Sequence, residues 1–167
     1  PIVQSMRQEL NFFEEALHPD SGIKFEIPIA HLIKREPNFK MYGDSSLRAC
    51  GGYCLDLSFW WHYDFDEEIQ GRTLLHLKNG NDPNFISINV LEYLTVILNY
   101  CATLVALETL SIDDPNPVVL SVTDNRSALN WTLHTSKKSM IGRALARFFC
   151  GLLIGSPLGI NSEWIAT

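Results

Sequence analysis

Apolar residues recur at helical spacing in several segments of the chain. In residues 4–17 a stripe of Met6, Leu10, Phe13 and Leu17 is separated by polar residues, which predicts an amphipathic helix. By the same spacing and by their start and stop signals, further helices are predicted at residues 66–78, 87–107, 125–135 and 139–155.

The segment at residues 87–107 differs from the other predicted helices because it is apolar on nearly every side. Its polar residues form a single stripe at helical spacing: Glu92, Thr95, Asn99 and Thr103. A helix of this kind is typically covered on most sides. The polar residues within it favour a buried core helix over a membrane span.

Strand patterns occupy the stretch after the first predicted helix and return near the end. Residues 39–46, 48–57 and 59–65 are predicted strands, and the short turns between them favour an antiparallel meander. Residues 117–124 form a continuous valine-rich run, which is typical of a central parallel strand. A last strand is predicted at residues 160–167. This order of elements predicts an α/β protein with a mixed sheet.

Two local details follow from the residue types. The pair Gly51-Gly52 lies inside the second predicted strand, where it favours a bulge or a close approach by another backbone. In the helix at residues 139–155 we expect one apolar face to point inward, formed by Ile141, Leu145, Phe148 and Leu152.

Composition narrows the class of protein. The 167 residues are 46% apolar and 19% charged, which fits one globular core and excludes a disordered or collagen-like chain. Four cysteines lie among apolar residues without zinc-site spacing, so we expect reduced thiols in an intracellular protein, cytoplasmic or nuclear. Because the chain begins at Pro1, we interpret it as a piece of a longer polypeptide.

Charge is distributed unevenly along the chain. The overall net charge is −6, yet residues 1–117 carry 17 acidic and 8 basic side chains while residues 118–167 carry 2 acidic and 5 basic ones. The second part is therefore the part that a polyanion would meet. Its basic run consists of Lys137, Lys138, Arg143 and Arg147. The default interpretation of such a run is a solvated helix face, and the alternative is a set of phosphate-binding residues. Asn125 is interpreted either as a sugar or phosphate contact or as a helix cap.

Three acidic residues stand out by position. Asp44 lies at the end of the first predicted strand, Asp124 ends the valine-rich strand, and Glu92 lies on the polar stripe of the apolar helix. In open α/β sheets the site lies beyond the carboxyl ends of the strands. If the two strands are neighbours, Asp44 and Asp124 meet there, and Glu92 joins them from the helix packed on the sheet.

Three carboxylates held close together repel one another unless a cation neutralises them. Oxygen ligands suit Mg²⁺ or Mn²⁺, and two such ions about 4 Å apart support phosphodiester hydrolysis. Each residue also has an alternative interpretation. Asp124 can be a helix cap, Glu92 can pair with an arginine, and Asp44 can be a turn residue.

Three motifs carry a resemblance to a known family. They are YGDSSLRACGGY at residues 42–53, SINVLEY at residues 87–93 and VTDNRSA at residues 122–128. In this order they resemble the ribonuclease H domain of retroelement reverse transcriptases, most closely that of DIRS-like tyrosine-recombinase elements. The likeness covers residues 39–167. Residues 1–38 resemble the segment that joins the connection region of the polymerase to ribonuclease H.

The resemblance implies a ribonuclease H-like mixed sheet and two-metal hydrolysis of the RNA strand of RNA–DNA hybrids, with the reverse transcriptase portion of a parent polyprotein as partner. By motif position Asp44, Glu92 and Asp124 correspond to the first three metal-binding and catalytic carboxylates of the family. The fourth, in an N-x-x-A-D motif, is not in this sequence. We therefore expect either a C-terminally truncated nuclease domain, whose activity depends on that residue in the parent protein, or a degenerate domain that binds protein or nucleic acid.

Overall fold

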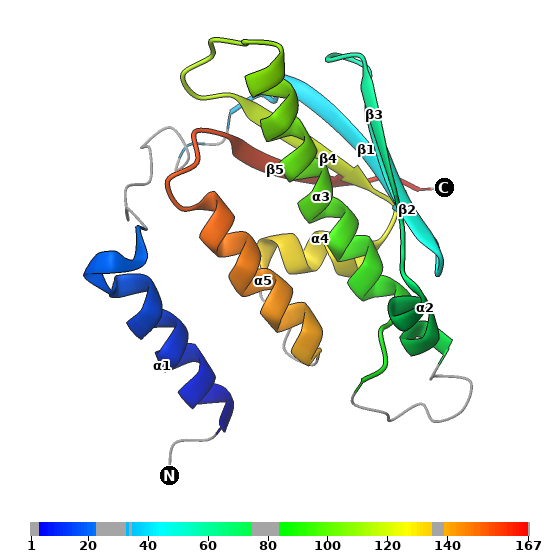
Figure 1. The fold of residues 1–167 in the computed structure, drawn as a ribbon. Helices are drawn as coiled ribbons and strands as arrows, with labels where there is room; N and C mark the ends of the chain where they lie inside the picture. The colour runs from blue at the N-terminus through cyan, green and yellow to red at the C-terminus, as the bar shows by residue number, and fades with distance from the viewer. Residues whose placement is uncertain (1–3, 23–32, 34, 75–83, 135–138, 167) are drawn as a thin grey trace.

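The structure is a computed structural model, and it describes residues 4–22, 33, 35–74, 84–134 and 139–166. Figure 1 shows the arrangement of the helices and strands. In chain order they are α1 (Gln4–Leu17), a short 3₁₀ turn η1 (Pro19–Ser21), β1 (Phe39–Ser45), β2 (Ala49–Cys54), β3 (Phe59–Asp64), α2 (Glu67–Thr73), α3 (Ile88–Thr109), β4 (Val118–Thr123), α4 (Arg126–Leu133), α5 (Met140–Leu153) and β5 (Gly159–Trp164).

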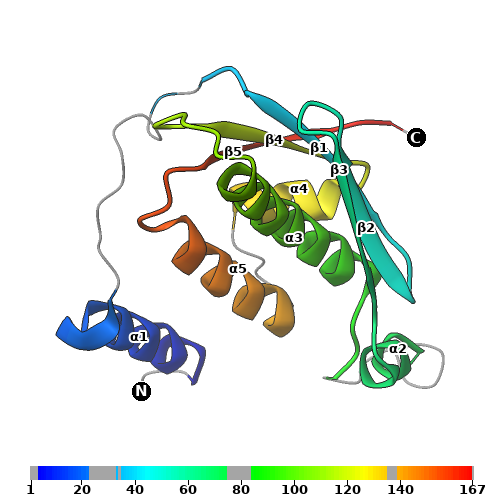
Figure 2. The ribbon, with the colours of Figure 1, turned by 45° about the horizontal axis from the view of Figure 1, so that its top comes forward.

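The five described strands form one mixed sheet in the order β3-β2-β1-β4-β5. β1, β2 and β3 are an antiparallel meander, whereas β4 runs parallel to both β1 and β5. The predicted meander and the predicted parallel strand are therefore confirmed. The described helices α3, α4 and α5 all lie on the same face of this sheet (Figure 2).

Helix α3 is the centre of the core. It crosses the sheet over β1, β2 and β4, and its aromatic residues Tyr93 and Tyr100 make edge-to-face contacts with Phe149 of α5. Every residue of β4 is buried, as its continuous apolar run predicts. By length and composition α3 is able to cross a membrane, but 61% of its most apolar window is buried inside the protein, which supports the prediction of a core helix.

The polar stripe of α3 faces the sheet at its glycines. A side-chain carbon added to Gly52 would lie 2.2 Å from Oδ1 of Asn99, and one added to Gly43 would lie 2.6 Å from Nδ2 of the same residue. The indole N–H of Trp61 donates to Oδ1 of Asn99 at 2.9 Å. The glycine pair thus permits the predicted close approach, although the approach comes chiefly from side chains of α3 and β3, and the β1–β2 register continues without a bulge.

One sequence expectation is tested only in part and another is wrong at one residue. The helix predicted at residues 66–78 begins as expected, because Asp66 caps it by accepting from the backbone N–H of Ile69. Its described part, α2, ends at Thr73, and residues 75–78 lie outside the described residues. In α5 Phe148 points outward and is 57% exposed, while its neighbour Phe149 is buried. Gly142 and Ala146 are buried beside Phe149, because their small side chains let α5 approach the core closely on that face.

Helix α1 has the predicted bounds but not a covered apolar face. It lies apart from the sheet, on the side of α5 (Figures 1 and 2). Its apolar stripe is more than half exposed at every position: Met6, Leu10, Phe13 and Leu17. The four cysteines are free thiols, as expected, although Cys150 is exposed.

Candidate metal centre

The three carboxylates singled out in the sequence meet at one end of the sheet. Asp44 lies near the end of β1 and Asp124 directly follows β4, and these strands are parallel neighbours whose carboxyl ends share one edge. Glu92 reaches the same point from the second turn of α3. One carboxylate oxygen from each residue lies within 4.8 Å of the other two. The predicted convergence is confirmed.

Glu92 is the buried member of this acidic group, with only 4% of its surface exposed. Its Oε1 accepts a hydrogen bond from the backbone N–H of Ser45 at 3.3 Å, whereas its Oε2 has no hydrogen-bond partner among the described residues. No ion pair with a basic side chain satisfies it within the described part of the chain. The alternative of a structural Glu–Arg pair is therefore wrong for the described residues.

Burial and like charge both act on the Glu92 carboxyl. Desolvation is the larger effect, the negative charges of Asp44 and Asp124 add to it, and together they raise the pKa of Glu92 to about 8. The hydrogen bond from Ser45 opposes this rise. Without a cation, this site favours a protonated Glu92 near neutral pH.

This raised pKa predicts how the metal-free protein responds to pH. From about pH 5 to about pH 8 the unfolded chain has released the Glu92 proton while the folded chain retains it, so the free energy of unfolding should fall as the pH rises. Each pKa unit corresponds to about 1.4 kcal/mol. Urea unfolding in a chelator should show this fall, and Glu92→Gln should flatten it. An equally steep fall in Glu92→Gln would contradict the prediction.

The other two carboxylates are not engaged in the roles of the alternative interpretations. Asn125, not Asp124, caps α4, and its side chain accepts from the backbone N–H groups of Ser127 and Ala128. Asp44 pairs with Gly51 inside the β1–β2 ladder rather than in a turn, and its Oδ1 accepts from the backbone N–H of Ser45 at 2.8 Å. Both side chains are accessible to solvent.

Sequence reasoning missed two residues that support this end of the sheet. The indole N–H of Trp164 on β5 donates to the backbone carbonyl of Asp124 at 2.8 Å. The guanidinium of Arg126 lies over the Trp164 ring, 4.2 Å from its centroid. Arg126 is within the TDNRSA motif, which was a usable signal. Trp164 is far away in sequence, so only the pairing of β4 with β5 reveals it.

The predicted nucleic-acid-binding residues come from three different parts of the chain. Asn125 is adjacent to it, but its side chain is engaged in the α4 cap and donates to Oδ1 of Asn89 at 2.9 Å. Arg143 and Arg147 lie one turn apart on α5, which packs against α3 and α4. Lys137 and Lys138 lie outside the described residues.

The donor set fits a divalent cation. All three side chains offer carboxylate oxygens, which are the preferred ligands of Mg²⁺ and Mn²⁺. The buried Oε2 of Glu92, which has no hydrogen-bond partner among the described residues, is a second sign that a ligand belongs here, since buried polar atoms are normally hydrogen-bonded or bound to an ion.

Comparison with protein-family models, curated proteins and solved structures gives no match for this chain. The fold and the acidic group therefore stand on the geometry alone.

Proposed function

We propose that residues 39–167 are a ribonuclease H-like nuclease domain of a retroelement-derived reverse transcriptase, which hydrolyses the RNA strand of RNA–DNA hybrids with two Mg²⁺ or Mn²⁺ ions. The mixed sheet, with its antiparallel meander followed by two parallel strands, agrees with the architecture that the sequence resemblance implies.

One observation carries the proposal. Asp44, Glu92 and Asp124 belong to the three separate motifs of the resemblance, and their carboxylates converge within 4.8 Å. Glu92 is held there although its burial and its two acidic neighbours disfavour its charged form. A fold retains such an unfavourable arrangement most readily when a cation offsets it.

The residues divide the work as follows. Asp44, Glu92 and Asp124 would hold the ions, which when bound supply a nucleophilic water and stabilise the leaving oxygen. The backbone N–H of Ser45 donates to both Glu92 and Asp44 and so fixes two of the three side chains relative to each other. The Asn125 cap fixes the chain directly after Asp124. The protein thus presents a preorganised anionic pocket rather than one assembled by the substrate.

A second candidate function is supported by the count of ligands. Among the described residues the acidic group contains three carboxylates and no fourth. Glu163, the other acidic residue of the C-terminal part, lies on β5 and is not in the group. A set of three carboxylates fits a non-catalytic descendant that keeps the fold and binds nucleic acid or protein. Such a protein would still bind a cation but would not cleave the hybrid.

The experiment that separates these candidates measures binding and cleavage in parallel. Mn²⁺ binding is followed by titration calorimetry, and cleavage by a labelled RNA–DNA hybrid with Mg²⁺, Mn²⁺ or chelator. The nuclease proposal expects weak, metal-dependent cleavage of the RNA strand alone. Mn²⁺ binding without cleavage favours the non-catalytic descendant, and the absence of both contradicts the metal centre itself.

A further inference from the structure

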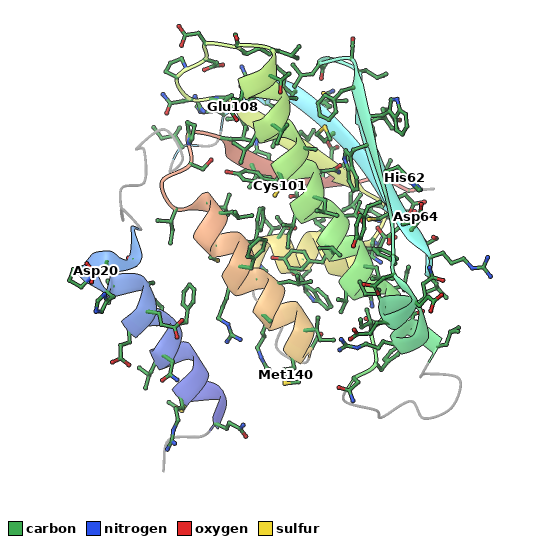
Figure 3. All side chains as sticks on the ribbon, viewed as in Figure 1. Asp20, His62, Asp64, Cys101, Glu108 and Met140 are labelled. Atoms are coloured by element: carbon green, nitrogen blue, oxygen red, sulfur yellow. The ribbon has the colours of Figure 1, made fainter. Side chains whose placement is uncertain are left out.

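An apolar groove runs between the edge strand β3 and helix α3, away from the acidic group. Its volume is about 840 Å³. Trp61 and Tyr63 of β3 line one wall, Leu98 and Val105 of α3 line the other, and Ile69 of α2 closes one end. Figure 3 shows the two borders of this region, with Cys101 on α3 and His62 and Asp64 on β3.

The groove explains why α3 is apolar on nearly every side. The sequence led us to expect a helix covered on most sides, and the face toward α5 and the sheet is covered. The face toward the groove is not, since Val105 is 62% exposed and Leu110 at the end of the helix is 52% exposed. Within the described residues this apolar face therefore has no complete cover.

Within the described part of the chain, the strand beside the groove has one row of backbone hydrogen-bonding groups that no other strand pairs with. Among the described strands β3 pairs only with β2, and the N–H of Phe65 donates to the carbonyl of Arg48 on that side. In an antiparallel ladder, successive residues alternate between facing the partner strand and facing away. The backbone groups of Trp60, His62 and Asp64 therefore face the free edge. A strand added there would place alternate side chains over the groove.

The charge around the groove selects the partner. The segments that build its walls and ends, residues 56–74 and 94–114, contain five and three acidic residues, and their only lysine or arginine is Arg72. Arg72 is itself paired with an acidic residue, because its Nη1 lies 3.8 Å from Oε1 of Glu68. Glu108 lies at the far end of α3 from Asp64 (Figure 3), so acidic residues flank the groove at both ends, although they do not line it. An occupant with lysine or arginine at its ends is favoured.

We propose that β3 and the groove bind an extended segment of another protein, which adds a strand to the sheet, alternates apolar with polar residues and carries lysine or arginine at its ends. Helix α1 of the same chain is a poor occupant, because it is helical and carries exposed Glu14 and Glu15. The proposal does not depend on nuclease activity, since the groove lies beside β3 and the acidic group at the ends of β1 and β4.

The test is a selection from a library of random 12-residue peptides on the immobilised protein, followed by affinities of single synthetic peptides from fluorescence anisotropy. We expect enriched peptides with alternating apolar residues and net positive charge. Val105→Glu should weaken their binding about tenfold, because it places a charge in the apolar contact. His62→Pro should also weaken binding, because it removes an outward N–H without removing a β2–β3 hydrogen bond.

Controls make the result decisive. Leu17→Glu alters an equally exposed apolar residue on α1 and should leave the affinity unchanged, and circular dichroism checks that each variant is folded. The proposal is overturned if no peptide is enriched, if enriched peptides are acidic or show helical periodicity, or if Val105→Glu binds like the wild type. Sedimentation showing a dimer that Val105→Glu dissociates would instead assign the groove to a second copy of the chain.

Discussion

Asp124→Asn should abolish metal-dependent cleavage of an RNA–DNA hybrid while leaving the protein folded. Asparagine keeps the shape of the side chain and removes one anionic ligand from a group of three. Loss of an outer-shell partner alone lowers metal affinity or activity by about 10–100-fold, so loss of a direct ligand should lower cleavage by at least about a hundredfold. The measurement is the initial rate of hybrid cleavage at saturating Mn²⁺, together with the Mn²⁺ dissociation constant.

The same substitution should not lower stability in a chelator, because it removes one of the charges that oppose Glu92. Asp113→Asn is the matched control, since Asp113 is exposed in the loop between α3 and β4. It should leave the cleavage rate and the Mn²⁺ affinity unchanged. Full cleavage by Asp124→Asn would contradict the assignment of this residue as a metal ligand.

Gly52→Ala should produce a larger loss of stability than the same substitution at Gly43 or Gly51. The new carbon would lie 2.2 Å from Oδ1 of Asn99 and 2.8 Å from the backbone carbonyl of Tyr42. Overpacking alone costs about 1–3 kcal/mol, and breaking the hydrogen bond between Trp61 and Asn99 adds about 1 kcal/mol. Urea unfolding should therefore show a loss of about 3 kcal/mol.

The control for Gly52→Ala is the same substitution in α5. A carbon added to Gly151 meets no atom within 4 Å, and alanine stabilises a helix interior by about 0.5–1 kcal/mol relative to glycine. Gly151→Ala should therefore raise the free energy of unfolding. If both variants lost the same stability, the close approach of α3 to the sheet would not explain the effect.

Regular patterns explain which parts of the fold were predictable. The valine-rich run at β4 and the short turns of the meander specify their elements locally, and the carboxylates follow from their positions relative to strand ends. The predicted inward face of α5 was wrong at Phe148, because Phe148 and Phe149 are both apolar and adjacent in sequence, whereas Ile141, Leu145 and Leu152 pack against the core as expected. The choice between them depends on the small residues Gly142 and Ala146 and on the rings of α3, which no local pattern reveals.

Contacts between distant segments were the other limit. The hydrogen bond between Trp61 and Asn99 and the stacking of Arg126 on Trp164 each join elements whose proximity depends on the completed sheet. The alternation of apolar and polar residues is regular enough to predict strands. It does not indicate which loop or helix approaches a glycine. The open face of α3 was likewise hidden, because an apolar residue in a groove and one in a core look the same in sequence.

The pairing of β1 with β4 also has a consequence for the order of folding events. These neighbours are separated in the chain by the meander, α2 and the whole of α3, so their contact closes a long loop and tends to form late. All three carboxylates of the acidic group are brought together only once that pairing is in place. Interactions formed after the transition state chiefly govern the unfolding rate. Neutralising the acidic group, by protons or by a divalent ion, would then slow the separation of β1 from β4. The unfolding rate should fall, while the folding rate should stay almost unchanged.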